Sequence, residues 1–362
     1  MFKEFPAAKD KMLQVMDETG TIVAPKWKPD ISDTDILKAY RFMVFARLAD
    51  QMAVSFQRQG RMYTYPPNLG QEAIQAAAGR IIQKNDWLIP AFRELGAWLL
   101  KGAKLRDIFA FWGGYEDGAR FTDAPNILPP AVPIGSQLPH ALGIAFALRY
   151  RGKRSVAFAF VGDGGTSQGD FHEALNFAGV WRVPLVVIIQ NNQYAISLPI
   201  REQTAAKNLS VKGLAYGIPG LKVDGNDYLA MVSALQHARE NARKNKGPVL
   251  IEGVTYRRGA HTTSDDPTLY RSVEEEKAWE ARDPLVRLQA YLASRGLWHE
   301  KDDRRLLTQY RAEVEKEFAE YERHPAYSVE EVFKYQYKEM PDDLKKQLVE
   351  YEKFLNRKEA RK

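Results

Sequence analysis

The stretch VGDGGTSQGDFHEALNFAGVWRVPLVVIIQNNQYAIS, from Val161 to Ser197, decides the fold of this chain. One apolar run, Ser155 to Val161, ends in Gly162-Asp163-Gly164, and a second, Leu185 to Gln190, ends in Asn191-Asn192. A helical pattern separates the two runs. Short runs rich in β-branched residues on either side of a helical pattern predict a strand–helix–strand unit with parallel strands.

The residues that follow the two predicted strands suit a metal-bound diphosphate. Ligands collect at the carboxyl ends of parallel strands, so Asp163 and Asn192 are expected to face one crevice. Carboxylate, amide and backbone carbonyl oxygens suit Mg²⁺, which often shares its ligand sphere with phosphate and water. Gly164 and Gly165 carry no side chain, so the backbone can approach a phosphate, and the helix that begins near Ser167 favours an anion at its start.

Other phosphate-binding motifs fit the same stretch poorly. Its glycines run G-x-G-x-x-x-x-G from Gly162 to Gly169 instead of G-x-G-x-x-G, and no G-K-[ST] follows. Twenty-six residues, 165 to 190, separate Gly164 from Asn191. A GDG…NN pattern with this spacing is the signature of thiamine diphosphate enzymes.

Beyond this signature, the chain resembles the α subunit of the E1 component of 2-oxo acid dehydrogenase complexes. The resemblance runs from about Ile36 to about Tyr351. It is carried by LGQEA (Leu69 to Ala73), ILPPAVPIGSQLPHALG (Ile127 to Gly143), GDGGTSQGDFHEALNFAG (Gly162 to Gly179), NNQYAIS (Asn191 to Ser197), GIPGLKVDGND (Gly217 to Asp227) and YRRGAHTTSDDPTLYR (Tyr256 to Arg271).

The resemblance implies thiamine diphosphate and Mg²⁺ as cofactors and assigns their binding residues. The metal would be held by Asp163, by the side-chain oxygen of Asn192 and by the main-chain carbonyl of Tyr194. Catalytic roles fall to His261, Phe92 and Arg93. The implied cofactor-binding set is Phe92, Arg93, Val132, Ile134, Gly162, Asp163, Gly164, Gly165, Asn192, Tyr194 and His261.

Several of these residues also have an ordinary structural interpretation. The planar guanidinium of an arginine can donate hydrogen bonds to two phosphate oxygens, yet Arg93 could equally be a surface residue in the first turn of a helix. Periodicity alone would place Ile134 in the core, and His261 could be a structural loop histidine. Asp170 and Glu173 lie on one helix face, where they could pass protons between paired sites or be exposed charges.

The resemblance also predicts partners. We find no second domain to supply the glutamate that thiamine activation needs against the pyrimidine ring. In the family that glutamate comes from a β subunit, so we expect an α₂β₂ heterotetramer with an E1 β subunit. A lipoyl-bearing E2 acyltransferase core would accept the acyl group from a small 2-oxo acid.

Pyruvate is the expected substrate, and three alternatives stay open. A branched-chain 2-oxo acid is the first, because the TTSDD stretch also resembles the branched-chain type. Thr64 takes a position where both types often carry phenylalanine, so it leaves the size of the pocket open. A non-catalytic structural subunit and a self-contained transketolase-like enzyme are the other two. Thr262 follows the histidine where mitochondrial relatives carry a regulatory phosphoserine, so that regulation does not carry over.

Composition limits the remaining functions. The chain has 362 residues, 45% hydrophobic and 27% charged, as in ordinary globular proteins. It has no cysteine, so disulfides and cysteine catalysis are excluded. The net charge of +6 is dispersed, which argues against nucleic acid as a partner. No apolar run of membrane-spanning length and no signal sequence occurs. We therefore expect no membrane partner, and we expect a location in the bacterial cytoplasm.

The predicted fold is α/β, a mostly parallel doubly wound sheet of the thiamine diphosphate-binding type. Residues 1–30, which contain Pro6, Pro25 and Pro29, are expected to form an irregular N-terminal arm that contributes little to the core. Residues 31–275 would form the diphosphate-binding domain, in which Asp33 caps a helix reaching to about Gln59 and another helix spans His140 to Arg151. A helical C-terminal extension would follow from 276 to 362, with Leu307, Val314 and Phe318 among its apolar stripe. Polar residues and Pro267 predict that no packed element fixes the loop from Thr262 to Arg271.

Overall fold

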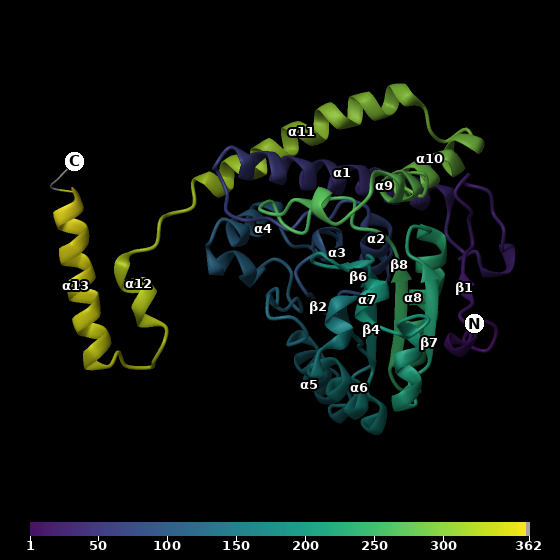
Figure 1. Cartoon of the computed structure of the whole chain (residues 1–362), viewed down its shortest axis with the longest axis horizontal. Helices are drawn as coiled ribbons and strands as arrows, with labels where there is room; N and C mark the ends of the chain where they lie inside the picture. The colour runs from purple at the N-terminus through teal and green to yellow at the C-terminus, as the bar shows by residue number, and fades with distance from the viewer. Residues whose placement is uncertain (360–362) are drawn as a thin grey trace. The chain divides into compact units, whose positions relative to one another are not determined.

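A six-stranded parallel sheet forms the centre of the fold (Figure 1). The structure is a computed structural model and describes residues 1–359. The strand order is β1-β7-β8-β4-β3-β2, and every neighbouring pair runs parallel. The strands are β1 (Met12–Leu13), β2 (Trp87–Ile89), β3 (Ala157–Gly162), β4 (Leu185–Asn191), β7 (Gly220–Asp224) and β8 (Val249–Val254). A separate antiparallel ribbon pairs β5 (Tyr194–Ala195) with β6 (Leu198–Pro199).

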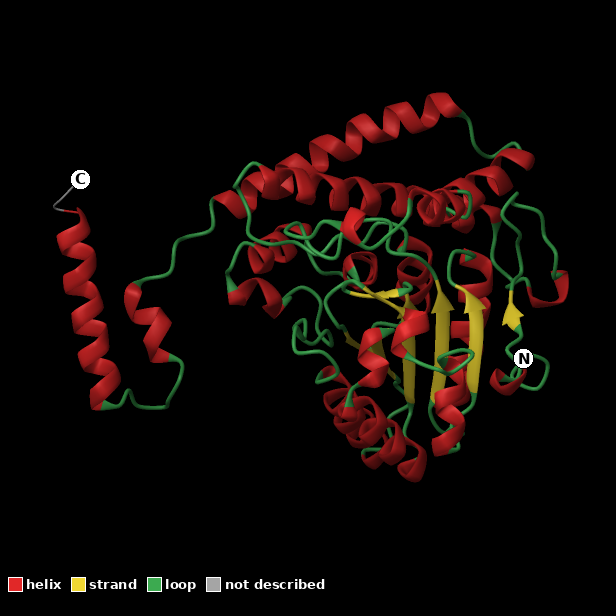
Figure 2. Ribbon diagram, viewed as in Figure 1, coloured by secondary structure: helices red, strands yellow, loops and turns green. Residues whose placement is uncertain are grey.

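Helices lie on both faces of this sheet (Figure 2). α5 and α6 pack on one face, and α2 and α8 pack on the other. The helices are α1 (Asp33–Arg58), α2 (Glu72–Ile81), α3 (Leu95–Lys101), α4 (Leu105–Trp112), α5 (Gln137–Tyr150), α6 (Gly169–Trp181), α7 (Ile200–Gln203), α8 (Tyr228–Arg243), α9 (Val273–Glu280), α10 (Pro284–Ser294), α11 (Glu300–Glu322), α12 (Val329–Lys334) and α13 (Asp342–Glu359).

The central strands are apolar along most of their length because both of their faces are covered. Ala159 and Val161 of β3 point into the core shared with α5 and α6. On the opposite face, a Cβ added at Gly253 of β8 would lie 2.7 Å from Cδ1 of Ile74 in α2. The predicted doubly wound α/β fold is therefore confirmed.

The strand register aligns the carboxyl ends of the central strands. Gly162 of β3 pairs with Gln190 of β4, which pairs in turn with Gly253 of β8. The residues that follow these positions therefore emerge at one edge of the sheet. Asp163 and Asn192 both belong to this edge.

The N-terminal segment contributes more to the core than its sequence predicts. β1 pairs with β7 at the edge of the sheet, and Leu13, Val15 and Met16 have no exposed surface. The Asp227 carboxylate accepts hydrogen bonds from the backbone N–H of Val15 at 2.6 Å and of Met16 at 2.7 Å. The expectation of an arm outside the core was wrong for this stretch, because a two-residue strand leaves no periodic pattern to read.

Other element boundaries also differ from the predictions. The side chain of Ser32, and not Asp33, caps α1 by accepting from the backbone N–H of Asp35 at 3.2 Å. α5 begins at Gln137, three residues before the predicted start at His140. Of the predicted apolar stripe in α11, Val314 and Phe318 are buried, whereas Leu307 is exposed.

The chain divides into two compact units, Met1–Phe318 and Ala319–Lys362. The first unit contains the whole sheet. Within the described part of the second unit, Ser328 and Glu331 form a capping box at the start of α12, which packs beside α13. From Val273 to Glu359 the described named elements are the helices α9 to α13, whereas the predicted division into domains at residues 30 and 275 stays a prediction.

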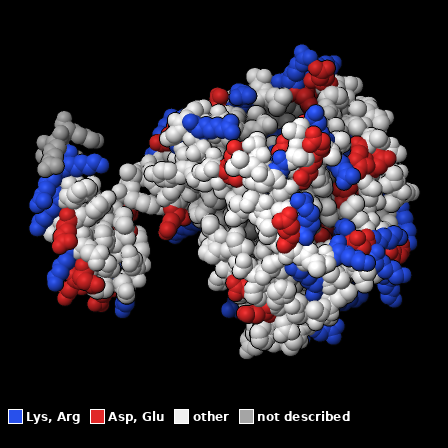
Figure 3. Space-filling view, viewed as in Figure 1, with Lys and Arg blue, Asp and Glu red and all other residues white. Residues whose placement is uncertain are grey.

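Charge is distributed evenly on the visible surface of the first unit. Figure 3 shows Lys and Arg interspersed with Asp and Glu instead of gathered into a patch of one sign. Within residues 1–359, no helix is both long enough and apolar enough to cross a membrane.

A buried ionic cluster joins α1, α2 and the start of α10. Arg47 of α1 donates two hydrogen bonds to Glu72 at 2.8 Å and two to Asp283 at 2.8 and 2.9 Å. Arg258, which follows β8, donates to the same carboxylate of Asp283. Burial alone would raise the pKa of Asp283, but Arg47 and Arg258 outweigh it and hold that pKa below its ordinary value.

We predict that Arg47→Met lowers the free energy of unfolding by about 3–5 kcal/mol, because it removes the cation paired with buried Glu72 and one of the two cations paired with buried Asp283. The stabilisation from Asp283 is present above its unfolded pKa, near 3.8, and is lost only as the pH falls below that value. Without Arg47, burial raises that pKa, so acid unfolding should begin at a higher pH. Urea unfolding across pH measures both effects.

The matched control is Arg304→Met, which removes an exposed pair with Glu300. It should change stability far less. Equal unfolding free energies for the two variants would contradict the assignment of a structural role to the buried cluster.

Candidate active site

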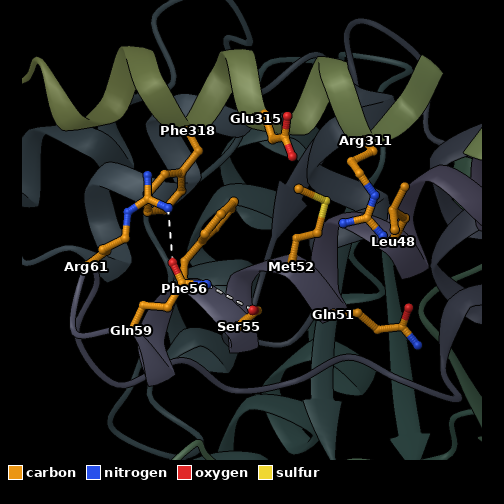
Figure 4. A pocket seen from close by; sticks show the side chains of 10 residues that line it. All are labelled: Leu48, Gln51, Met52, Ser55, Phe56, Gln59, Arg61, Arg311, Glu315 and Phe318. Atoms are coloured by element: carbon orange, nitrogen blue, oxygen red, sulfur yellow. Dashed lines mark hydrogen bonds between the residues drawn. The ribbon is translucent and has the colours of Figure 1, made fainter. Parts of the chain in front are cut away.

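Two cavities of similar size in the first unit differ in chemistry. One, of about 560 Å³, lies between α1 and α11, where Phe56 stacks on Phe318 and Gln59 hydrogen-bonds to Ser55 (Figure 4). The other, of about 520 Å³, lies at the carboxyl ends of β2, β3 and β4. Only the second of the two collects polar groups from several strand ends, which is where parallel α/β sheets bind ligands. It is the candidate site.

Ten of the eleven predicted cofactor-binding residues line this cavity, and Val132 does not. Val132 is 55% exposed, and its neighbours Ala131, Ile134 and Gly135 line the cavity instead. Ile134 is 46% exposed, so the core position that periodicity alone suggested is wrong. The lining residues from the predicted set are Phe92, Arg93, Ile134, Gly162, Asp163, Gly164, Gly165, Asn192, Tyr194 and His261.

Three oxygen atoms converge where β3 and β4 end. The side-chain oxygen of Asn192 lies 3.2 Å from Oδ1 of Asp163 and 3.1 Å from the carbonyl oxygen of Tyr194. The other oxygen of Asp163, Oδ2, is buried and has no hydrogen-bond partner among the described residues. Burial raises the pKa of Asp163 to about 6. Oxygens packed this closely need a donor between them, which a 180° rotation of the Asn192 amide would supply, or a cation.

This oxygen set fits a metal that is shared with a second ligand. Within residues 1–359, no cluster of three or more His, Cys, Asp or Glu side chains could hold a metal ion by itself. Asp163, Asn192 and the Tyr194 carbonyl provide three oxygens, which is half of an octahedral shell of about six. A metal here would therefore need oxygens from a bound anion and from water.

Glycine is required at the bend after β3 because other atoms come close. A Cβ at Gly165 would lie 2.4 Å from Cγ2 of Val161, and one at Gly164 would lie 2.8 Å from the Cβ of Ala195. Past the end of β4, the chain turns sharply, with φ of +75° at Gln193 and +57° at Ile196. Left-handed non-glycine residues are strained, and such strain often accompanies functional sites.

Two arginines and His261 form a cluster beside the three oxygens, since Arg257 donates to the Tyr194 carbonyl at 3.2 Å. The Nδ1 atom of His261 lies 3.4 Å from a guanidinium nitrogen of Arg93 and 3.3 Å from one of Arg257. Both guanidinium groups are donors only, so Nδ1 accepts and the ring proton of neutral His261 resides on Nε2. Burial, and then the charges of Arg93 and Arg257, lower the pKa of His261 to about 4. The imidazole is therefore neutral at pH 7.

Both arginines are buried, and backbone carbonyl oxygens hold them in place. Arg93 donates to the carbonyls of Pro67 and His261, and Arg257 donates to those of Tyr194 and Ile196. Burial, and then the charge of Arg257, lower the pKa of Arg93 to about 9. Two buried cations side by side favour an anion in the cavity, since it would neutralise charge that the protein leaves uncompensated.

Hydrogen bonds anchor the loop behind His261, contrary to the prediction that no packed element fixes it. The Asp265 carboxylate accepts from the backbone N–H of His261 at 2.7 Å and from the Tyr270 hydroxyl at 2.5 Å. Arg271 is buried and donates to the carbonyls of Arg257 and Gly259. A polar composition gave no sign of these partners, which lie on neighbouring segments.

The sequence predictions missed a buried carboxylate in the cavity wall. Glu94 accepts from the side chain of Gln190 at 3.0 Å and from the backbone N–H of Arg93 at 3.0 Å. Burial raises its pKa to about 8. The sequence signal that could have identified Glu94 as a site residue is its position directly after the predicted site residue Arg93. Gln71, whose side chain reaches Asn192 at 3.2 Å, was missed as well, although it lies in the LGQEA stretch.

Three other residues that the sequence singled out do not line the cavity. Asp170 and Glu173 lie in the first turns of α6, and Glu173 is exposed. Thr64 is exposed and does not shape the pocket. The proton-transfer role considered for the two acids stays a prediction.

Comparison with known proteins agrees with the geometry. A family model described as "Dehydrogenase E1 component" matches residues 40–330. The chain is 44% identical over 342 residues to the pyruvate dehydrogenase E1 component subunit alpha of Acholeplasma laidlawii, covering 94% of this chain and 99% of that one. It is 40% identical over 341 residues to the Staphylococcus aureus protein of the same name, covering 94% and 92%. This chain belongs to the dehydrogenase E1 component family.

Proposed function

We propose that this chain is the α subunit of a pyruvate dehydrogenase E1 component, which decarboxylates pyruvate and transfers the acetyl group to a lipoyl-bearing E2. The observation that carries the proposal is the convergence of Asp163, Asn192 and the Tyr194 carbonyl beside a glycine-lined bend. Relatives with 40–44% identity bear the pyruvate dehydrogenase name. These names favour pyruvate over a branched-chain 2-oxo acid.

The cavity fits a Mg²⁺-bound thiamine diphosphate. Asp163, Asn192 and the Tyr194 carbonyl would hold Mg²⁺, and the backbone at Gly164 and Gly165 would lie against the diphosphate. The unpartnered Oδ2 of Asp163 supports this fit. The chemistry supplied by thiamine diphosphate, when bound, is a nucleophilic carbon that also serves as the electron sink for loss of CO₂.

The chain's own residues would bind the anionic groups, orient them and donate hydrogen bonds to them. Arg93 and Arg257 provide positive charge where the anionic groups lie, and carbonyl contacts hold both side chains. His261 faces them with Nδ1, so its Nε2–H is the group left to donate to an anion or to the acyl oxygen. Phe92 lies under the Arg93 guanidinium, 5.4 Å from its central carbon to the ring centroid, and completes the wall.

A partner is needed to complete this site. The first unit contains one parallel sheet, and the ribbon of β5 and β6 is the other named β structure in residues 1–359. Three carboxylates line the cavity. Asp163 belongs to the proposed metal set, Glu94 is bonded to Gln190, and Glu202 is exposed beside Arg201 at 3.5 Å. We therefore propose that an E1 β subunit supplies the carboxylate for the pyrimidine ring, in a cytoplasmic heterotetramer.

The assembled pair should decarboxylate pyruvate faster than 2-oxoisovalerate, and this chain alone should be inactive with both. Steady-state decarboxylation by the purified chain, by its β subunit and by the co-expressed pair tests this, with thiamine diphosphate and Mg²⁺ present throughout. Faster turnover of 2-oxoisovalerate than of pyruvate would show that the substrate is a branched-chain 2-oxo acid. Thiamine-dependent turnover by the chain alone would overturn the proposed half-site.

His261→Ala should slow acetyl transfer by about 10²- to 10⁴-fold, the usual cost of losing a positioned donor. Folding should survive, because the Asp265 anchor uses the backbone N–H of residue 261. With a pKa of about 4, His261 should add no limb near pH 6.5 to the wild-type pH–rate profile. Overall activity with β subunit and E2 measures the rate, and exposed His299 provides the control His299→Ala. A near wild-type rate for His261→Ala would make this histidine structural.

A further inference from the structure

A buried carboxylate lies in the middle of the sheet, close to the end of β4 but outside the active-site cavity. Glu252 belongs to β8, is 1% exposed and pairs with Ile189 of β4. All three hydrogen bonds that it accepts within residues 1–359 come from uncharged N–H groups. Burying a carboxylate without a cation is unfavourable, so these donors are needed to keep it in the sheet. The position of each donor therefore indicates what the carboxylate holds in place.

One oxygen of Glu252 fixes the orientation of the Asn191 side chain. Oε1 accepts from Nδ2 of Asn191 at 2.8 Å. A carboxylate only accepts, so the amide nitrogen must face it and the amide oxygen must face the other way. That oxygen accepts from the backbone N–H of Gln193 at 3.3 Å and from its side chain at 3.1 Å. Glu252 is thereby connected to the turn, left-handed at Gln193, that carries Asn192 and the Tyr194 carbonyl.

The other oxygen of this carboxylate holds a segment that reaches the bend after β3. Oε2 accepts from the backbone N–H groups of Leu209 at 2.8 Å and of Ser210 at 2.9 Å. Two residues further along, Lys212 donates to the carbonyl and the hydroxyl of Thr166 at 2.8 and 2.9 Å. The Thr166 hydroxyl donates in turn to the carbonyl of Asp163 at 2.8 Å. Hydrogen bonds from one carboxylate therefore lead to both strand ends that carry the proposed metal ligands.

We propose that Glu252 is a positioning residue for the metal site, which holds the turn after β4 in place through Asn191. This inference rests on the proposed function, since it takes the converging oxygens to be a metal site. Glu252 does not line the cavity, so it acts only through other residues. Loss of a group that orients metal ligands usually weakens metal binding by about 10- to 100-fold.

An exchange of amide and carboxylate between positions 252 and 191 tests this coupling. Glu252→Gln leaves two N–H groups facing each other in either amide orientation, and Asn191→Asp places two carboxylates face to face. Each single substitution should raise the Mg²⁺ concentration needed for half-maximal thiamine diphosphate binding by about 10- to 100-fold.

The double variant should restore the hydrogen bonds with donor and acceptor exchanged. The amide at position 252 can donate to the carboxylate at 191 and still accept from Leu209 and Ser210. The carboxylate at 191 can still accept from Gln193. The Mg²⁺ requirement should therefore return to within about threefold of wild type, which is far from the sum of the two single effects.

Calorimetric titration of thiamine diphosphate into the assembled α/β pair, at a series of Mg²⁺ concentrations, measures this requirement. The matched control is Asp227→Asn, which also alters a buried carboxylate that accepts from backbone N–H groups but does not line the cavity. Both Asp227→Asn and Glu252→Gln should lower the unfolding temperature. Only Glu252→Gln should change the Mg²⁺ requirement.

Hydrogen exchange reports on the same coupling without cofactor. The backbone N–H of Gln193 is bonded to the Asn191 side chain, so Glu252→Gln should speed its exchange in the cofactor-free pair. We expect about a 2- to 10-fold increase, which corresponds to the net contribution of one hydrogen bond. Mass spectrometry of peptides that cover residues 191–197 measures it, and the double variant should exchange at the wild-type rate.

The outcomes separate the positioning role from the proposed function. If the double variant restores the Mg²⁺ requirement but the wild-type pair does not act on pyruvate, the positioning role stands and the proposed function fails. If the pair acts on pyruvate and Glu252→Gln leaves the Mg²⁺ requirement unchanged, the positioning role is wrong.

Three further results bear on the role of Glu252. Equal changes of the Mg²⁺ requirement in Glu252→Gln and Asp227→Asn would show that Glu252 acts through stability alone. If Glu252→Gln by itself does not fold, the comparison of Asn191→Asp with the double variant decides. A double variant that does not fold, or that needs as much Mg²⁺ as Asn191→Asp, would overturn the proposal.

Discussion

The parallel, in-register pairing of β3 with β4 is the constraint on which the site depends. Gly162 pairs with Gln190, so both strands end at the same level of the sheet. Asp163 and Asn192, which follow these positions, therefore lie next to each other. The turn after Asn192 then folds back and brings the Tyr194 carbonyl to the same point. A slip of one residue would move Asp163 to the other face of the sheet and separate these oxygens.

The arginine cluster beside these oxygens has the complementary charge. Within residues 1–359, neither Arg93 nor Arg257 is held by an ion pair, and backbone carbonyls fix both side chains. Burying guanidinium groups without a carboxylate is unfavourable, so the binding of an anion beside them is favoured. The neutral His261 between them accepts from both groups through Nδ1. A metal-bound diphosphate would bring a cation to these oxygens and an anion to the two arginines.

The sequence predicted the parts of this site that local pattern determines. Asp163 and Asn192 follow strands long enough to recognise, so their convergence was foreseeable. Val132 does not line the cavity, because loop geometry, and not periodicity, decides which residue of a proline-rich segment faces it, and its cofactor-binding role stays a prediction. The burial of Glu94 depends on Gln190, almost a hundred positions away, and such pairing has no local signature. β1 was missed for a similar reason, because it is stabilised by β7 and by Asp227 and not by its own sequence.

The central claim is that Asp163 and Asn192 hold a metal that in turn holds a diphosphate. The most direct measurement is calorimetric titration of thiamine diphosphate into the assembled α/β pair at fixed Mg²⁺, for wild type, Asp163→Ala and Asn192→Ala. Asp163→Ala should weaken binding most, Asn192→Ala less, and Asp123→Ala, which removes an exposed acid, not at all. Unchanged affinity in a folded Asp163→Ala pair would contradict the account.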